Sequence, residues 1–83
     1  MEDSSMIKMT YDKQADAIYF YFSNKKVSYS KELDSERIID YSSDDKPVGV
    51  ELLNVSNGVN TDDLPNQAEI ERALFDKGIR TYA

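Results

Sequence analysis

The chain has 83 residues, no cysteine and no histidine, and its 16 acidic and 10 basic side chains give a net charge of −6. This length fits one domain with a modest core. The missing residue types exclude disulfides and thiolate chemistry, and they remove the commonest general base and metal ligand. The acidic balance argues against nucleic-acid binding, and no apolar run is long enough to span a bilayer. We expect a cytoplasmic protein with no cofactor.

Alternation of apolar and polar residues predicts the first two strands. Residues 1–5 are polar and are expected to form a disordered start. Met6–Tyr11 alternates like a half-buried strand near an edge, and Ala17–Phe22 is apolar or aromatic on both faces, which is typical of a central strand. Between them, Asp12 and Asp16 are expected to cap the turn by accepting backbone hydrogen bonds.

Three more segments have the same alternation: Val27–Leu33, Ile38–Ser42 and Pro47–Val55. Short polar loops between successive strands would place Phe20 opposite Tyr29 and Ile39 opposite Val50. In this register the strands agree on which face is the core. Residues 6–55 are therefore predicted to form an antiparallel β-meander of about five strands.

Three segments carry a resemblance to a known family: Tyr11–Tyr19, Ile39–Tyr41 and Val48–Leu53. At this combined spacing they resemble the small bacterial proteins of the domain-of-unknown-function 2283 family (DUF2283). The resemblance covers roughly Met6 to Val55 and implies a compact, sheet-based α+β fold. It implies no activity, because the family has none assigned.

The C-terminal third changes from strand to helix character. A helix is predicted over residues 64–77, beginning either at Pro65 or at Asn66, which has Glu69 three residues later as in a capping pair. Gly78 is placed to end it.

Ile70 and Leu74 form a narrow apolar stripe on this helix, so we expect it to pack on the sheet. Residues 79–83 alternate again and are either a short last strand or a tail. The predicted fold is thus a single α+β domain over residues 1–83, an antiparallel meander with one C-terminal helix.

One candidate site consists of carboxylates on the outer face of the sheet. In the expected register Glu32 lies directly opposite Asp40, with Glu51 on the same face one strand over. Like charges in this arrangement are unfavourable unless something compensates them. Arg37 and Lys31 folding over, a bound Mg²⁺ or Ca²⁺, or a basic partner would do so, while a solvated acidic face is the simplest alternative. A flat sheet holds a cation poorly, so no metal site is predicted.

The other candidate site is aromatic. Tyr19 and Tyr21 point to the outer face, where either the helix covers them or they anchor a protein interface. If the helix covers the opposite face, the tyrosines are free and a homodimer across them is favoured. Phe75 falls off the helix stripe, and we expect it to pack against Ile79 or Tyr82 rather than to be exposed for a partner.

Three classes of function remain after these exclusions. An enzyme is disfavoured, because carboxylates, tyrosines and lysines here have no partner at motif spacing. A non-enzymatic binding module that docks a small basic protein, as an antitoxin does, suits an acidic surface with exposed tyrosines. The alternative is a homo-oligomer assembled through the tyrosine-bearing face or an edge strand. The candidate partner-binding residues are Tyr19, Tyr21, Glu32, Asp40, Glu51 and Phe75.

Overall fold

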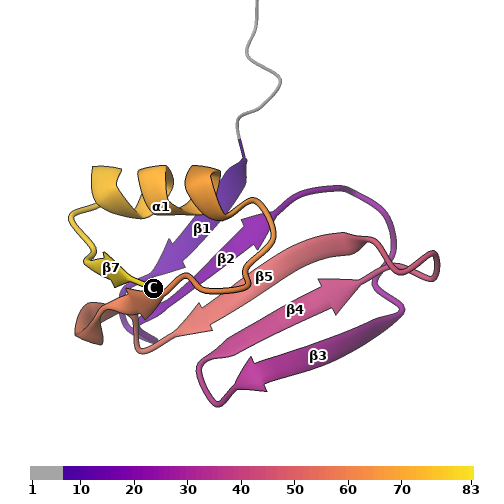
Figure 1. Ribbon diagram of the computed structural model, residues 1–83, viewed down its shortest axis with the longest axis horizontal. Coiled ribbons are helices and arrows are strands. Elements are labelled where there is room, and N and C mark those ends of the chain that lie inside the picture. The colour runs from indigo at the N-terminus through magenta and orange to yellow at the C-terminus, as the bar shows by residue number, and fades with distance from the viewer. Residues whose placement is uncertain (1–6) are drawn as a thin grey trace, which may run out of the picture.

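Five antiparallel strands form the main sheet of the computed structural model, which describes residues 7–83 (Figure 1). They are β1 (Lys8–Asp12), β2 (Ala17–Tyr21), β3 (Tyr29–Asp34), β4 (Arg37–Tyr41) and β5 (Pro47–Leu53). The other elements are the 3₁₀ turn η1 (Val55–Asn57), β6 (Val59–Asn60), the helix α1 (Gln67–Asp76) and β7 (Thr81–Tyr82). The predicted α+β class is confirmed. The disordered start expected at residues 1–5 lies outside the described residues.

The strand order, β1-β2-β5-β4-β3, is not that of a simple meander. Three strands in sequence, β3 to β5, form a meander, and β2 lies beside the last of them, which is Greek-key order. The prediction that Phe20 lies opposite Tyr29 is therefore wrong, because Phe20 pairs with Val50. The prediction that Ile39 lies opposite Val50 is confirmed.

Burial explains why β5 and not β3 is the neighbour of β2. In β5, Val48, Gly49, Val50 and Leu52 are all buried, so this strand needs neighbours on both sides. In β3 only Leu33 is even partly buried. An exposed, charged strand at the edge and an apolar strand at the centre bury more apolar surface than the sequential order would.

The helix covers one face of the sheet, which we call the inner face. Ile70 and Leu74 pack there with side chains from three strands, including Ile18, Phe20 and Val50, and all five are at most 1% exposed. Burying the two helix side chains contributes on the order of 3–6 kcal/mol before conformational entropy is subtracted. No helix of the described part of the chain, residues 7–83, lies on the outer face of the sheet.

Backbone hydrogen bonds define both ends of α1. Asn66 is the N-cap residue, which agrees with the second of the two predicted helix starts. Its side chain accepts no capping hydrogen bond. At the other end the Gly78 N–H donates to the Phe75 carbonyl and the Ile79 N–H donates to the Leu74 carbonyl, which is a Schellman motif. Gly78 has φ +76°, as the predicted stop requires.

The chain after the helix forms a short last strand, which is one of the two alternatives expected for residues 79–83. β7 pairs with β6 in parallel, with Val59 opposite Thr81 and Asn60 opposite Tyr82. β6 was not predicted, because two residues are too few to show a periodicity.

Both aspartates of the β1–β2 turn accept hydrogen bonds. Asp12 caps its own turn, since its Oδ1 accepts from the Ala15 N–H at 3.1 Å. Asp16 instead accepts from the N–H and hydroxyl of Ser56, at 3.0 and 2.7 Å. Asp16 thus joins this turn to η1.

Candidate functional site

The outer face of the sheet brings together most of the predicted site residues. Strand alternation points the following side chains to it: Lys8, Thr10, Tyr19, Tyr21, Ser30, Glu32, Ile38, Asp40 and Glu51. Tyr19, Ile38, Asp40 and Glu51 are half-buried there, and Tyr21 is 44% exposed. Five of the six predicted site residues therefore share one surface.

Tyr19 reaches across β5 to a carboxylate on β4. Its hydroxyl donates to Asp40 Oδ2 at 2.6 Å, and the Ser30 hydroxyl donates to Asp40 Oδ1 at 2.5 Å. The tyrosine ring passes over Gly49, where an added Cβ would lie 2.2 Å from the Tyr19 hydroxyl oxygen. The glycine is therefore what allows one side chain to span three strands.

Burial and the neighbouring carboxylates raise the pKa of Tyr19 well above its ordinary value. Burial of the hydroxyl has the largest effect. The hydrogen bond to Asp40 comes next, and electrostatic repulsion from Asp40 and Glu51 raises the pKa further. The phenol therefore stays protonated at physiological pH and acts as a hydrogen-bond donor. Asp40 thus has its two oxygens occupied by hydroxyl donors.

The remaining two carboxylates lie in one row across the sheet. Ile38 is opposite Glu51 on one side and opposite Glu32 on the other. The expectation that Glu32 lies opposite Asp40 is wrong, because the β3–β4 turn pairs Asp34 with Arg37, and the register shift between Glu32 and Asp34 then brings Ser30 opposite Asp40. The acidic side chains are thus separated by an apolar one and do not directly oppose each other.

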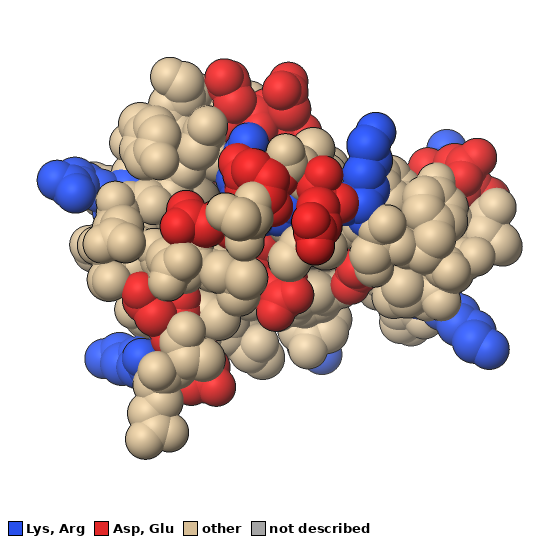
Figure 2. Space-filling model, turned by 90° about the horizontal axis from the view of Figure 1, so that it is seen from below, with Lys and Arg blue, Asp and Glu red and all other residues tan. Residues whose placement is uncertain are grey.

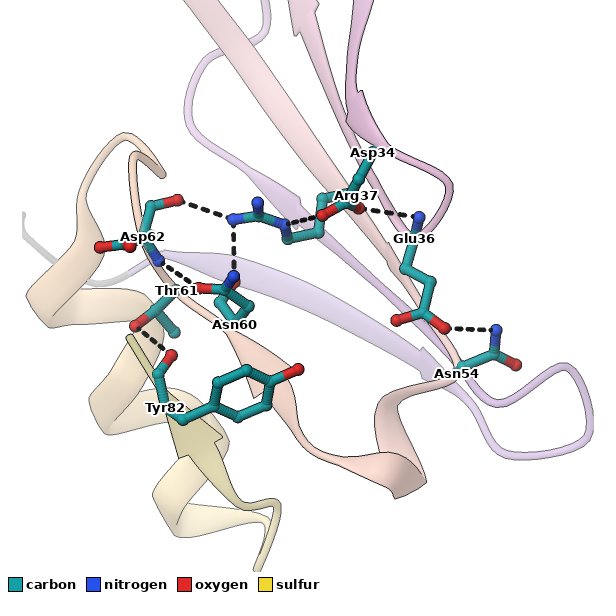
Figure 3. A network of polar contacts seen from close by, with 8 residues as sticks. All are labelled: Asp34, Glu36, Arg37, Asn54, Asn60, Thr61, Asp62 and Tyr82. Atoms are coloured by element: carbon teal, nitrogen blue, oxygen red, sulfur yellow. Dashed lines mark hydrogen bonds and ion pairs between the residues drawn. The ribbon is translucent and has the colours of Figure 1, made fainter.

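The basic residues considered as internal partners for these carboxylates are directed elsewhere. Arg37 Nη1 donates to the carbonyls of Asn60 and Asp62 at 3.0 and 2.7 Å, and its Nε donates to Asp34 at 3.0 Å (Figure 3). Lys31 pairs with the core residue Ile39 and therefore lies on the inner-face side of β3.

Glu32 and Glu51 consequently lack an ion-pair partner within residues 7–83, where the ion pairs within 4 Å are Lys25–Asp44 and Arg37–Asp34. Seen from the β3 side, acidic side chains gather over the middle of the view, and basic ones lie both beside them and at the margins (Figure 2). In the part of the chain that the structure describes, no three acidic side chains converge as a metal site would require.

Tyr21 adds an exposed aromatic ring to the outer face. Its ring packs edge-on against Tyr19, with centroids 4.6 Å apart and planes at 69°. It also borders an open hollow of about 550 Å³, whose other apolar walls include Phe22, Val27 and Val48. A large exposed ring beside a hollow is a common anchor in protein interfaces.

Phe75 does not belong to this surface. It lies on α1, which packs on the inner face, and its side chain is 79% exposed. The expectation that it packs against Ile79 or Tyr82 is wrong, because Ile79 packs against the core instead and Tyr82 is itself exposed.

Sequence reasoning missed three residues of the outer face. No role was predicted for Ile38, Ser30 or Gly49. Ile38 lies opposite Glu32, the Ser30 hydroxyl donates to Asp40, and Gly49 lies against the Tyr19 ring. Gly49 carried a usable signal, because a glycine inside a buried strand often marks a close approach of another group.

These features define a small α+β domain in which, over residues 7–83, the helix covers one face of the sheet and leaves the other uncovered. The chain belongs to the family described as "Protein of unknown function (DUF2283)", whose model matches residues 8–56. That range contains every outer-face residue named above and excludes α1. The family description assigns no activity.

One curated relative is a putative hypoxanthine phosphoribosyltransferase from Methanosarcina mazei, 40% identical over 67 residues. The match covers 78% of this chain and 54% of the relative, so the chain spans about half the length of that protein. No solved structure matches the chain. Within residues 7–83, α1 is too short and too polar to cross a membrane.

Proposed function

We propose that the chain is a non-enzymatic binding module that docks a basic protein partner on the outer face of its sheet. The observation that carries this proposal is the row formed by Glu32, Ile38 and Glu51, in which two carboxylates without an ion pair to any residue of 7–83 flank an apolar side chain. Such a row offers a basic partner both charge complementarity and apolar contact.

The remaining outer-face residues support the same role. Tyr21 supplies an exposed aromatic anchor, and the hydrogen bonds that Tyr19 and Ser30 donate to Asp40 hold neighbouring strands in one fixed arrangement. A rigid surface loses little conformational entropy on binding. The net charge of −6 would also steer a positively charged partner toward it.

The relative's name adds no activity to this proposal. A phosphoribosyltransferase activity would belong to the whole relative, and 46% of that protein's length lies outside the match with this chain. The antitoxin-like character of the module remains an analogy of class, based on small size and acidic charge.

The test is affinity capture from lysate of the source organism, with the double variant Glu32→Lys/Glu51→Lys beside the wild type. The matched control is Asp62→Lys/Asp76→Lys, which changes the net charge equally at exposed positions outside the outer face. We expect a basic protein that is retained by the wild type and the control, is lost by the outer-face variant, and is released at high salt. Retention of the same protein by both double variants would contradict the proposal.

The alternative function is a homo-oligomer formed through the tyrosine-bearing face or an edge strand, and for the tyrosine-bearing face it is tested by measuring self-association. Tyr21→Ala would then abolish self-association with little dependence on salt, because the contact would be mainly apolar.

A further inference from the structure

The two edge strands of the sheet, β1 and β3, each pair with one strand only among residues 7–83, and they differ in how well they match a second copy of themselves. A two-fold axis perpendicular to the sheet pairs two edge strands antiparallel and keeps the inner faces on one side. Residues directly opposite each other must point to the same face of the sheet. The axis therefore lies midway between one residue and the same residue of the second copy.

At β3 this symmetry brings like charges together. The strand runs from Tyr29 to Asp34, so its centre falls between Lys31 and Glu32. The two nearest registers place Lys31 opposite Lys31 of the second copy, or Glu32 opposite Glu32. Like charges directly opposite destabilise a pair, and the register shift after Glu32 further interrupts this edge.

At β1 the same symmetry brings complementary residues together. The strand runs from Lys8 to Asp12, pairs regularly with β2 along its whole length, and has Thr10 at its centre. A two-fold axis at Thr10 places Lys8 opposite Asp12 of the second copy, and Asp12 opposite Lys8. On the inner face, Met9 of each copy lies opposite Tyr11 of the other copy. A thioether and an aromatic ring attract each other in such a pair.

The edge of β1 has room and unused apolar surface. An open hollow of about 260 Å³ lies along it, lined by Lys8, Met9, Thr10 and Tyr21. Met9 and Tyr11 pack against the core but are only half-buried. A second strand at this edge would cover them and would pair the backbone groups of β1 that face away from β2.

From these features we infer that the chain forms a homodimer by antiparallel pairing of β1 with β1 of a second copy about Thr10. The product is one continuous sheet with five strands from each copy. α1 packs on the inner face of the sheet, so the two helices share one side of the dimer. The two outer faces share the other side, and the dimer contact leaves Glu32 and Glu51 free.

The test uses two charge reversals, Lys8→Asp and Asp12→Lys, studied separately and mixed. In each variant alone, both cross-strand pairs become like-charge pairs, so we expect the dimer dissociation constant to rise by roughly tenfold to a hundredfold. In the mixed dimer both pairs are again of opposite charge. We therefore expect the equimolar mixture to recover a dissociation constant near that of the wild type, with the heterodimer identified by native mass spectrometry.

The mixture separates a lost contact from a lost fold. Asp12→Lys also removes the hydrogen bond from the Ala15 N–H, but a misfolded subunit would not rescue its partner on mixing. Lys31→Asp on the other free edge is the matched control, and it should dimerise like the wild type.

Three results would overturn the inference: a monomeric wild type in sedimentation at submillimolar concentration, no recovery on mixing, or equal weakening by Lys31→Asp. None of these results bears on the proposed binding function, because that function is tested by residues outside β1.

Discussion

At the scale of single residues, Gly49 is a position of the outer face at which an added side chain does not fit. An added Cβ would lie 2.2 Å from the Tyr19 hydroxyl oxygen and 2.6 Å from the Phe20 carbonyl oxygen, both far inside van der Waals contact. We predict that Gly49→Ala lowers the free energy of unfolding by about 1–3 kcal/mol in urea denaturation. Because Tyr19 causes part of the clash, the double variant with Tyr19→Ala should cost less than the sum of the single variants. Additive costs would contradict this contact.

A second prediction at this scale concerns Tyr29 and alkaline pH. The hydrogen bond that its hydroxyl donates to Asp45, at 2.6 Å, raises the pKa of Tyr29 from 10.0 to about 12. A pKa raised by folding adds stability that is fully present below pH 10 and is lost as the pH rises toward 12. Tyr29→Phe should therefore lose less stability than the wild type between pH 10 and pH 12 in denaturation series. Tyr82→Phe, at an exposed position, should follow the wild type.

At the scale of secondary-structure elements, Arg37 joins the sheet to the C-terminal segment. Its guanidinium contacts Asp34 and the carbonyls of Asn60 and Asp62, and its side chain is only 11% exposed. Arg37→Met keeps much of the stem but removes these hydrogen bonds, so we predict a loss of about 2–4 kcal/mol in the free energy of unfolding.

Hydrogen exchange locates the effect of this substitution. The N–H groups of Val59 and Thr61 donate to the carbonyls of Arg80 and Tyr82, and they should exchange faster in Arg37→Met than the amides of β2. A uniform increase over all strands would instead indicate general destabilisation. Arg80→Met, at an exposed residue of the same segment, serves as the control.

The elements themselves could be predicted from the sequence, whereas the pairing of β2 could not. Alternation located all five strands, and the apolar stripe with Gly78 located the helix. Periodicity describes one strand at a time, so it could not show that β5 would take the place beside β2. That choice follows from a comparison of burial, because β5 is apolar on nearly every position and β3 is exposed on nearly every position.

At the scale of the whole molecule, the helix decides which surface is free. α1 packs its stripe on the face of Ile18 and Phe20, and this leaves Tyr21, Glu32 and Glu51 on the other side. The two faces of β2 are both apolar in the sequence, so the sequence could name the two alternatives but not choose between them. The choice separates Phe75 from the other predicted site residues.

We propose that a basic partner docks on the outer face and not on the helix side. Site-specific photo-crosslinking tests it most directly, with benzoylphenylalanine placed at Tyr21 in one sample and at Phe75 in another. Both positions are exposed, at 44% and 79%, but they lie on opposite faces of the sheet. We predict a crosslink to one basic protein from position 21 and none from position 75. A crosslink to that protein from position 75 alone would contradict the account.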